Sequence, residues 1–153
     1  MKLSVRGEYA LRALLVLAER YADAVVPIQT IATQQNIPRR FLEQILHGLK
    51  GAGLVESRRG ITGGYRLARP PAQISLASII RQVDGAIAPV SCVSQRFYEK
   101  CSCPDETRCA LRSVMKEVRD TVAIMMEQKS LADLVVRAES LKIRPFEAVD
   151  FVI

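Results

Sequence analysis

Residues 36–68 decide the fold, and they read NIPRRFLEQILHGLKGAGLVESRRGITGGYRLA. Apolar residues in the first half recur at the three- and four-residue spacing of one helix face: Phe41, Leu42, Ile45, Leu46 and Leu49. This spacing predicts a helix from Pro38 to about Lys50, ended by the glycines at 51 and 53. Two short strand-like runs follow, at 54–57 and 65–68, with a glycine-rich turn between them. They predict a β-hairpin directly after the helix, which is a wing.

Upstream of this stretch, two more helices are expected. Residues 8–21 carry apolar side chains along one broad helix face: Leu11, Leu14, Leu15, Leu17 and Ala18. Pro27 suits the start of a second helix, from Ile28 to Gln35, because its missing N–H costs nothing in the first turn of a helix. A short break at 36–37 leads into the next helix. Helix, turn, helix and hairpin together predict a winged helix-turn-helix domain over residues 1–85.

The second half of the chain predicts a loop followed by a long helix. Ser75 caps a helix at 76–83, and residues 86–108 show little periodicity. From Cys109 to about Gln128, apolar residues step by four, three, four and three: Leu111, Met115, Val118, Val122 and Met125. This heptad row is typical of a helix that pairs with another helix, so we expect a dimerisation helix and a homodimer.

A short helix from 131 to about 138 completes a unit at 109–140, and residues 141–153 are expected to form a weakly ordered tail. The predicted fold class is therefore mainly α with a small β-hairpin wing: a winged helix-turn-helix plus a long dimerisation helix. The loop at 86–108, which separates the two parts, is the expected sensor because it holds nearly all of the cysteines.

The charge is concentrated in the first half. The chain has a net charge of +6, and residues 1–70 hold eleven Lys and Arg against five Asp and Glu, whereas residues 71–153 hold eleven of each. A basic module beside a neutral one indicates nucleic acid as the partner of the first. The start of the 38–50 helix would read bases in the major groove, and the wing would contact phosphate or the minor groove. A protein-interaction module without DNA is the alternative. The candidate DNA-contacting residues are Arg39, Arg40, Phe41, Glu43, Gln44, Arg58, Arg59, Gly63, Gly64 and Tyr65.

All four cysteines lie in one segment: Cys92, Cys101, Cys103 and Cys109. Thiolates are the soft ligands that iron–sulfur clusters use. Cys109 lies at the start of a predicted helix, whose positive end lowers the pKa of a thiol. Zinc is a weaker alternative, because zinc sites usually show pairs of Cys-x-x-Cys and Cys101 is separated from Cys103 by one residue. A thiol switch without a cluster, and inert cysteines, are the other possibilities.

Several motifs, taken in order along the chain, resemble one family of regulators. The 41–46 run, Gly53-Leu54-Val55, Arg59-Gly60, Gly63-Gly64-Tyr65 and the opening Glu8-Tyr9-Ala10-Leu11-Arg12 are similar to those of the Rrf-type winged-helix transcription regulators, the family of IscR, NsrR, RirA and CymR. The similarity extends to about residue 138. It implies a homodimer on double-stranded DNA with an imperfect palindrome, and a role for Glu43 in choosing between DNA sequences.

The resemblance also implies an iron–sulfur cluster, of two or four irons, bound by Cys92, Cys103 and Cys109. IscR-like proteins space the last two cysteines by five residues, as Cys103 and Cys109 are spaced here. The histidine ligand expected three residues after the last cysteine is replaced by Arg112. The fourth ligand would then be Cys101, a solvent molecule, or Glu8 of the partner subunit, which stands where NsrR-like relatives use a carboxylate.

We therefore expect a sequence-specific transcription regulator, a repressor, that responds to a cluster or to redox state. The alternative is a cluster-free regulator controlled by thiol oxidation or, as in CymR-like relatives, by a protein corepressor. An enzyme is not expected, because the chain has no Cys-x-x-Cys and its single histidine, His47, is far along the chain from the cysteines. No apolar stretch reaches the ~20 residues of a membrane span and the opening lacks a signal-peptide apolar region, so a cytoplasmic location is expected.

Overall fold

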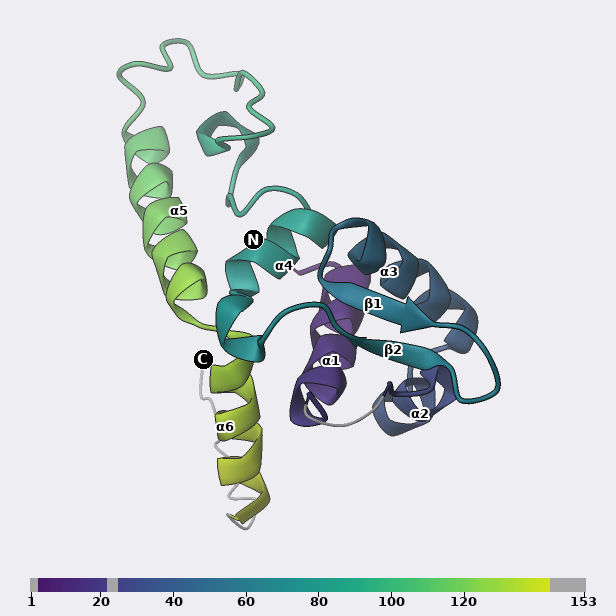
Figure 1. The fold of residues 1–153 in the computed structure, drawn as a ribbon. Coiled ribbons are helices and arrows are strands. Elements are labelled where there is room, and N and C mark those ends of the chain that lie inside the picture. The colour runs from purple at the N-terminus through teal and green to yellow at the C-terminus, as the bar shows by residue number, and fades with distance from the viewer. Residues whose placement is uncertain (1–2, 22–24, 144–153) are drawn as a thin grey trace.

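Helix α1 (Val5–Glu19) is the centre of the fold (Figure 1). The structure, a computed structural model, describes residues 3–21 and 25–143. α1 begins three residues before the predicted start because Ser4 caps it: the Ser4 hydroxyl accepts a hydrogen bond from the Gly7 amide (2.9 Å). One face of α1, including Leu14 and Leu17, is buried in the main core.

The helix-turn-helix consists of α2 (Ile28–Gln35) and α3 (Arg39–Gly51). α2 has the predicted bounds. The turn between them needs a left-handed residue, and Asn36 supplies it with φ 50°, a conformation that asparagine tolerates better than most residues. On α3 the predicted apolar face is buried except for Phe41, which is half-buried: Leu42, Ile45, Leu46 and Leu49 pack into the core.

The wing is an antiparallel hairpin of β1 (Val55–Arg58) and β2 (Gly64–Leu67), with Val55 opposite Leu67. It is fastened to the rest of the N-terminal domain, here called the head (α1 to α4), by a bridge between Val26 and Tyr65. The backbone groups of these two residues exchange hydrogen bonds of 2.8 and 2.9 Å. The two chains run so close that a Cβ on Gly64 would lie 2.5 Å from the Val26 carbonyl carbon and 2.9 Å from the Pro27 nitrogen. The bridge therefore requires glycine at position 64.

A 3-10 turn, η1 (Pro71–Gln73), leads into α4 (Leu76–Val83), which has the predicted bounds and is capped by Ser75. At the end of α4 the carboxylate of Asp84 accepts hydrogen bonds from the Ser4 amide (3.0 Å) and the Ser4 hydroxyl. Gly7 leaves room for this carboxylate. The N-terminus of α1 and the C-terminus of α4 are thus joined where the chain leaves the head for the cysteine loop.

The last two helices are α5 (Ala110–Gln128) and α6 (Leu131–Ile143). The backbone between them pairs with the start of α4, since the Leu76 amide donates to the Lys129 carbonyl (2.8 Å) and the Leu131 amide to the Ile74 carbonyl (2.9 Å). Leu131 is fully buried in the core of the head. α6 continues five residues past its predicted end, so 141–143 are helical, and the rest of the predicted tail, 144–153, lies outside the described residues.

Helix α5 stands beside the head, with the cysteine loop above it (Figure 1). Val122, Ala123 and Met126 pack against a small cluster of Ala77, Ile80 and Ile87, yet none of the nineteen residues of α5 is buried. The apolar side chains left exposed include Leu111, Val114, Val118 and Met125. Among the described helices, none is long and apolar enough to cross a membrane. The mainly helical fold with one small hairpin confirms the predicted fold class.

Candidate DNA interface and cysteine loop

An open groove lies between the wing and the starts of α2 and α3. Three arginines line it: Arg39 from α3, and Arg58 and Arg59 from the wing. The other lining residues are Pro27, Ile28, Gln29, Ser57, Gly60, Gly63, Gly64 and Tyr65. Side chains that the sequence analysis took from two separate motifs therefore form one basic surface, as a duplex contacting both helix and wing would need.

On α3, the predicted contact residues divide by exposure. Arg40 and Gln44 are exposed, and Arg39 is paired with Glu43 at 3.1 Å with about half of each side chain in solvent. Phe41 has an internal role, because its ring meets Tyr9 of α1 edge to face with 5.7 Å between centroids. Glu43 thus neutralises Arg39 when DNA is absent. Arg39 can contact DNA only if this ion pair breaks.

In the wing, the glycines and Tyr65 have roles within the chain. The Gly63 amide donates to the Gly60 carbonyl (2.9 Å) and so closes the turn at the tip. Gly64 and Tyr65 form the bridge to Val26. Arg58 and Arg59 are exposed. The wing therefore has a hydrogen-bonded backbone that presents arginine side chains.

Two arginines of α5 hold the start of the cysteine loop. η2 (Ser91–Val93) contains Cys92, which is buried. Arg112 donates from Nε to the Cys92 carbonyl (3.2 Å), and Arg119 donates to the Val93 carbonyl (2.5 Å). Arg112 stands where the family resemblance expects a histidine ligand, and no sequence motif distinguishes Arg119. In the structure both fix the segment that carries the first thiol.

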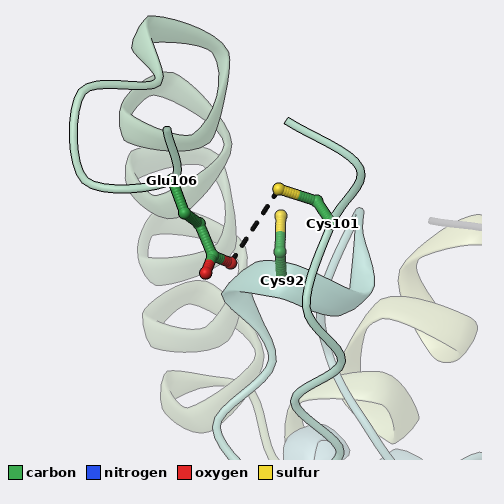
Figure 2. A group of neighbouring side chains, drawn as sticks. All are labelled: Cys92, Cys101 and Glu106. Atoms are coloured by element: carbon green, nitrogen blue, oxygen red, sulfur yellow. Dashed lines mark hydrogen bonds between the residues drawn. The ribbon is translucent and has the colours of Figure 1, made fainter. Parts of the chain in front are cut away.

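The four thiols lie in one region, in two groups. The sulfurs of Cys103 and Cys109 are 3.6 Å apart, and the Cys109 sulfur caps α5 by accepting from the Arg112 amide (3.4 Å). The sulfurs of Cys92 and Cys101 and a carboxylate oxygen of Glu106 all lie within 4.8 Å of one another (Figure 2). Glu106 was missed by the sequence analysis, because nothing in its spacing distinguishes it from other acidic residues of the loop.

Hydrogen bonds within this group shift the pKa values of the thiols. Contacts with the side chains of Cys101 and Cys109 raise the pKa of Cys103 to about 12. A hydrogen bond from the Cys103 backbone lowers the pKa of Cys101, which marks Cys101 as the thiol that ionises first of these two. Burial raises the pKa of Cys92 most, and the nearby Cys101 raises it further. The sulfurs thus interact as one set of donors, and thiolates gathered in this way suit a thiophilic metal or a cluster.

Glu8, the partner-subunit ligand suggested by the resemblance, is paired with Arg12 of its own helix at 3.1 Å and is exposed. His47 is exposed on α3. Within one chain the structure therefore gathers the four cysteines and Glu106, and leaves Glu8 on the head.

Comparison with known proteins agrees with this geometry. The family model of the Rrf2 regulators, described as iron-dependent transcriptional regulators, matches residues 3–137. An rrf2-like helix-turn-helix transcriptional regulator of Rhodobacter capsulatus is 40% identical over 131 residues, covering 83% of this chain and 87% of the relative. The structure of CymR, the global cysteine regulator of Bacillus subtilis, superposes with a TM-score of 0.77 and 32% identity over 90% of this chain and 98% of that one.

The structure of IscR from T. potens superposes with a TM-score of 0.74 and 29% identity, covering 95% of this chain and 94% of that one. The matched relatives include transcriptional regulators of the helix-turn-helix type, and the basic groove, the wing and the helix-turn-helix are all present here. The chain accordingly belongs to the Rrf2 family of winged-helix transcriptional regulators, and it is a DNA-binding regulator and not an enzyme.

Proposed function

We propose that this regulator binds an imperfect palindrome as a homodimer, acts as a repressor, and responds to an iron–sulfur cluster held by its cysteine loop. The observation that carries the proposal is the gathering of four thiols at the start of α5, within 18 residues of sequence and beside two arginines. The IscR relatives support the cluster. Cys92, Cys103 and Cys109 are the proposed ligands, in a two-iron or four-iron cluster.

The proposed dimer rests on α5. Leu111, Val118 and Met125 of the heptad row are 63%, 42% and 63% exposed, and Val114, which the sequence analysis did not include, adds to the same face. Val122 of the predicted row packs within the chain. Burial of such a side chain stabilises an interface by ~1.5–3 kcal/mol. The α5 helix of a second protomer would bury this face.

When bound, the cluster would supply a centre whose charge and integrity change with oxygen, iron or redox state. The residues of this chain supply the connection to DNA. Arg112 and Arg119 fix the Cys92 segment to α5, and the connection from α5 to α6 is fixed to the start of α4 by the backbone hydrogen bonds of Lys129 and Leu131. The start of the loop is fixed to the N-terminus of α1 through Asp84. A change in the loop would therefore act on the head along two routes.

Purification without oxygen, followed by absorption spectroscopy and assays of iron and sulfide, tests the cluster directly. We expect a coloured protein with equal amounts of iron and acid-labile sulfide, which Cys92→Ser, Cys103→Ser and Cys109→Ser each lose and Cys101→Ser retains. DNA affinity should differ between the loaded and the iron-free protein. A colourless protein that holds neither iron nor sulfide, with DNA binding that none of these Cys→Ser variants changes, would contradict the proposal.

A cluster-free thiol switch is the second candidate, favoured by the 3.6 Å between the sulfurs of Cys103 and Cys109 and by the likeness to CymR. A disulfide needs ~2.05 Å, so a small movement suffices. A two-electron oxidant such as a peroxide would take two electrons and two protons from the two thiols. A protein corepressor is a further form of this candidate. Mass spectrometry after peroxide treatment of the iron-free protein would detect the loss of two hydrogens and locate the bond.

Arg59→Ala should weaken DNA binding at every sequence and reduce the salt dependence of the affinity by about one unit of slope per protomer, because a lost phosphate contact releases fewer counterions. Gln44→Ala is the matched comparison: it should cost ~1–3 kcal/mol at one base position and leave the salt slope unchanged. Titration of labelled operator DNA at several salt concentrations measures both. Wild-type binding by Arg59→Ala at all salt concentrations would exclude the wing contact.

A further inference from the structure

Glu106 is oriented like a metal ligand. Its side chain is 17% exposed, and its two oxygens have different partners. One oxygen, Oε2, accepts a hydrogen bond from the Tyr98 hydroxyl at 2.6 Å. The other, Oε1, lies 3.9 Å from the Cys101 sulfur (Figure 2). It also lies 3.7 Å from Arg112 Nε. The carboxylate is therefore held by Tyr98 at Oε2, while Oε1 faces the thiols and accepts a hydrogen bond from Cys101.

The spacing of the donor atoms suits a tetrahedral centre. Metal–sulfur bonds of ~2.3 Å and metal–oxygen bonds of ~2.0–2.2 Å place neighbouring ligand atoms roughly 3.5–3.8 Å apart. The sulfur of Cys101 and the oxygen of Glu106 are already 3.9 Å apart, and no pair among the three donors exceeds 4.8 Å. Small side-chain movements would close the site, and the hydrogen bond from Arg112 to the Cys92 carbonyl holds the backbone of this ligand in place.

The surroundings supply what a metal site of this kind needs outside its ligands. A hydrogen bond to a ligating carboxylate fixes its orientation, and Tyr98 makes one here. Two thiolates and a carboxylate carry three negative charges, which a divalent ion and the guanidinium of Arg112 would balance.

We infer that Cys92, Cys101 and Glu106 form a three-ligand site for a thiophilic metal within one loop of one chain. The metal is a zinc-like divalent ion or an iron of the cluster, and the fourth position is left to solvent or sulfide. The inference rests on the proposed function and departs from it at one residue: Cys101, which is not among the proposed cluster ligands, is a metal ligand here. It also places the carboxylate ligand in the same chain, whereas the family pattern would bring Glu8 from the partner subunit. Tyr98 is a positioning residue.

Titration of the reduced, iron-free, full-length protein with Co²⁺ under nitrogen tests this site without reference to DNA binding. Thiolate ligation gives a charge-transfer band in the near ultraviolet, and tetrahedral geometry gives intense d–d bands in the visible. We expect Glu106→Gln and Cys101→Ser to weaken Co²⁺ binding by more than ~100-fold, and Tyr98→Phe by ~10-fold, in the range known for outer-shell partners. Glu106→Gln keeps the volume and the acceptor for Tyr98, so its folding is not at risk.

Glu99→Gln, which removes an exposed carboxylate of the same loop, and Glu8→Gln are the matched controls, and both should bind Co²⁺ like the wild type. Equal affinity in Glu106→Gln and wild type, or a loss in Glu99→Gln as large as that in Glu106→Gln, would overturn the inference. Anaerobic reconstitution with iron and sulfide identifies the metal: retention of cluster in Cys101→Ser assigns the site to a divalent ion, and its loss assigns the site to the cluster. A protein that binds Co²⁺ as expected but assembles no cluster would refute the proposed cluster and leave the site intact.

Discussion

Replacement of Gly64 by alanine is expected to lower the free energy of unfolding by about 3 kcal/mol, the upper end of the range for overpacking a tight site. The new methyl group would meet the backbone of Val26 and Pro27 and not a side chain that could turn aside. Relief requires separation of the two chains, which breaks both hydrogen bonds of the Val26–Tyr65 bridge. Because this bridge fastens the wing to the head, DNA affinity should fall with stability.

Gly51→Ala is the control for the Gly64 variant. Gly51 is the last residue of α3 and has no atom within 4 Å of the position that a Cβ would take. Alanine there should be neutral or stabilise by ~0.5–1 kcal/mol, as expected when glycine is replaced in a helix. Urea unfolding followed by circular dichroism measures both variants. Equal stability of Gly64→Ala and wild type would show that the wing is not held by the bridge.

Val118→Glu should convert the protein to a monomer and abolish tight binding to a palindromic operator. Val118 is 42% exposed, in the middle of the apolar face of α5. In a two-fold interface each substitution occurs twice, and burial of an unpaired carboxylate costs several kcal/mol per ion. The two symmetric carboxylates would also repel each other. Sedimentation at micromolar concentration, with and without operator DNA, measures the effect.

Lys116→Glu provides the comparison on the same helix. Lys116 is exposed and lies two residues from Val118, about 200° around the helix, so its substitution changes the charge of a different face. It should leave the dimer intact. A dimeric Val118→Glu protein would place the interface elsewhere than on this face of α5.

Local signals in the sequence were sufficient where a helix has clear start and stop residues. Ser75 and the Asp84 position bound α4, and Pro27 and Asn36 bound α2, so both helices have their predicted limits. α1 was predicted too short because its apolar face begins after its cap, Ser4, whose role depends on the Gly7 amide. α6 was predicted too short at its other end, where the mixed run Glu139-Ser140-Leu141-Lys142-Ile143 continues the helix.

The cysteine loop was predictable in composition but not in arrangement. Spacing along the chain associates Cys103 with Cys109, and the structure also brings these two sulfurs together. Spacing could not show that Cys92 would lie beside Cys101, which is nine residues later in the chain. That approach depends on Arg112 and Arg119, which reach across from α5. The glycines of the wing are a similar case, since the neighbour that requires Gly64 is 38 residues earlier in the chain.

Leu131 determines how parts of this protein can be exchanged with those of its relatives. Its side chain fills the core of the head from the far end of the chain, and α6 packs along α1 behind it. A chimera joined at residue 85 would leave a foreign side chain in that core. Grafting a sensor from another regulator therefore calls for two junctions, one after α4 and one before Leu131, so that residues 86–128 are replaced and each head retains its own α6.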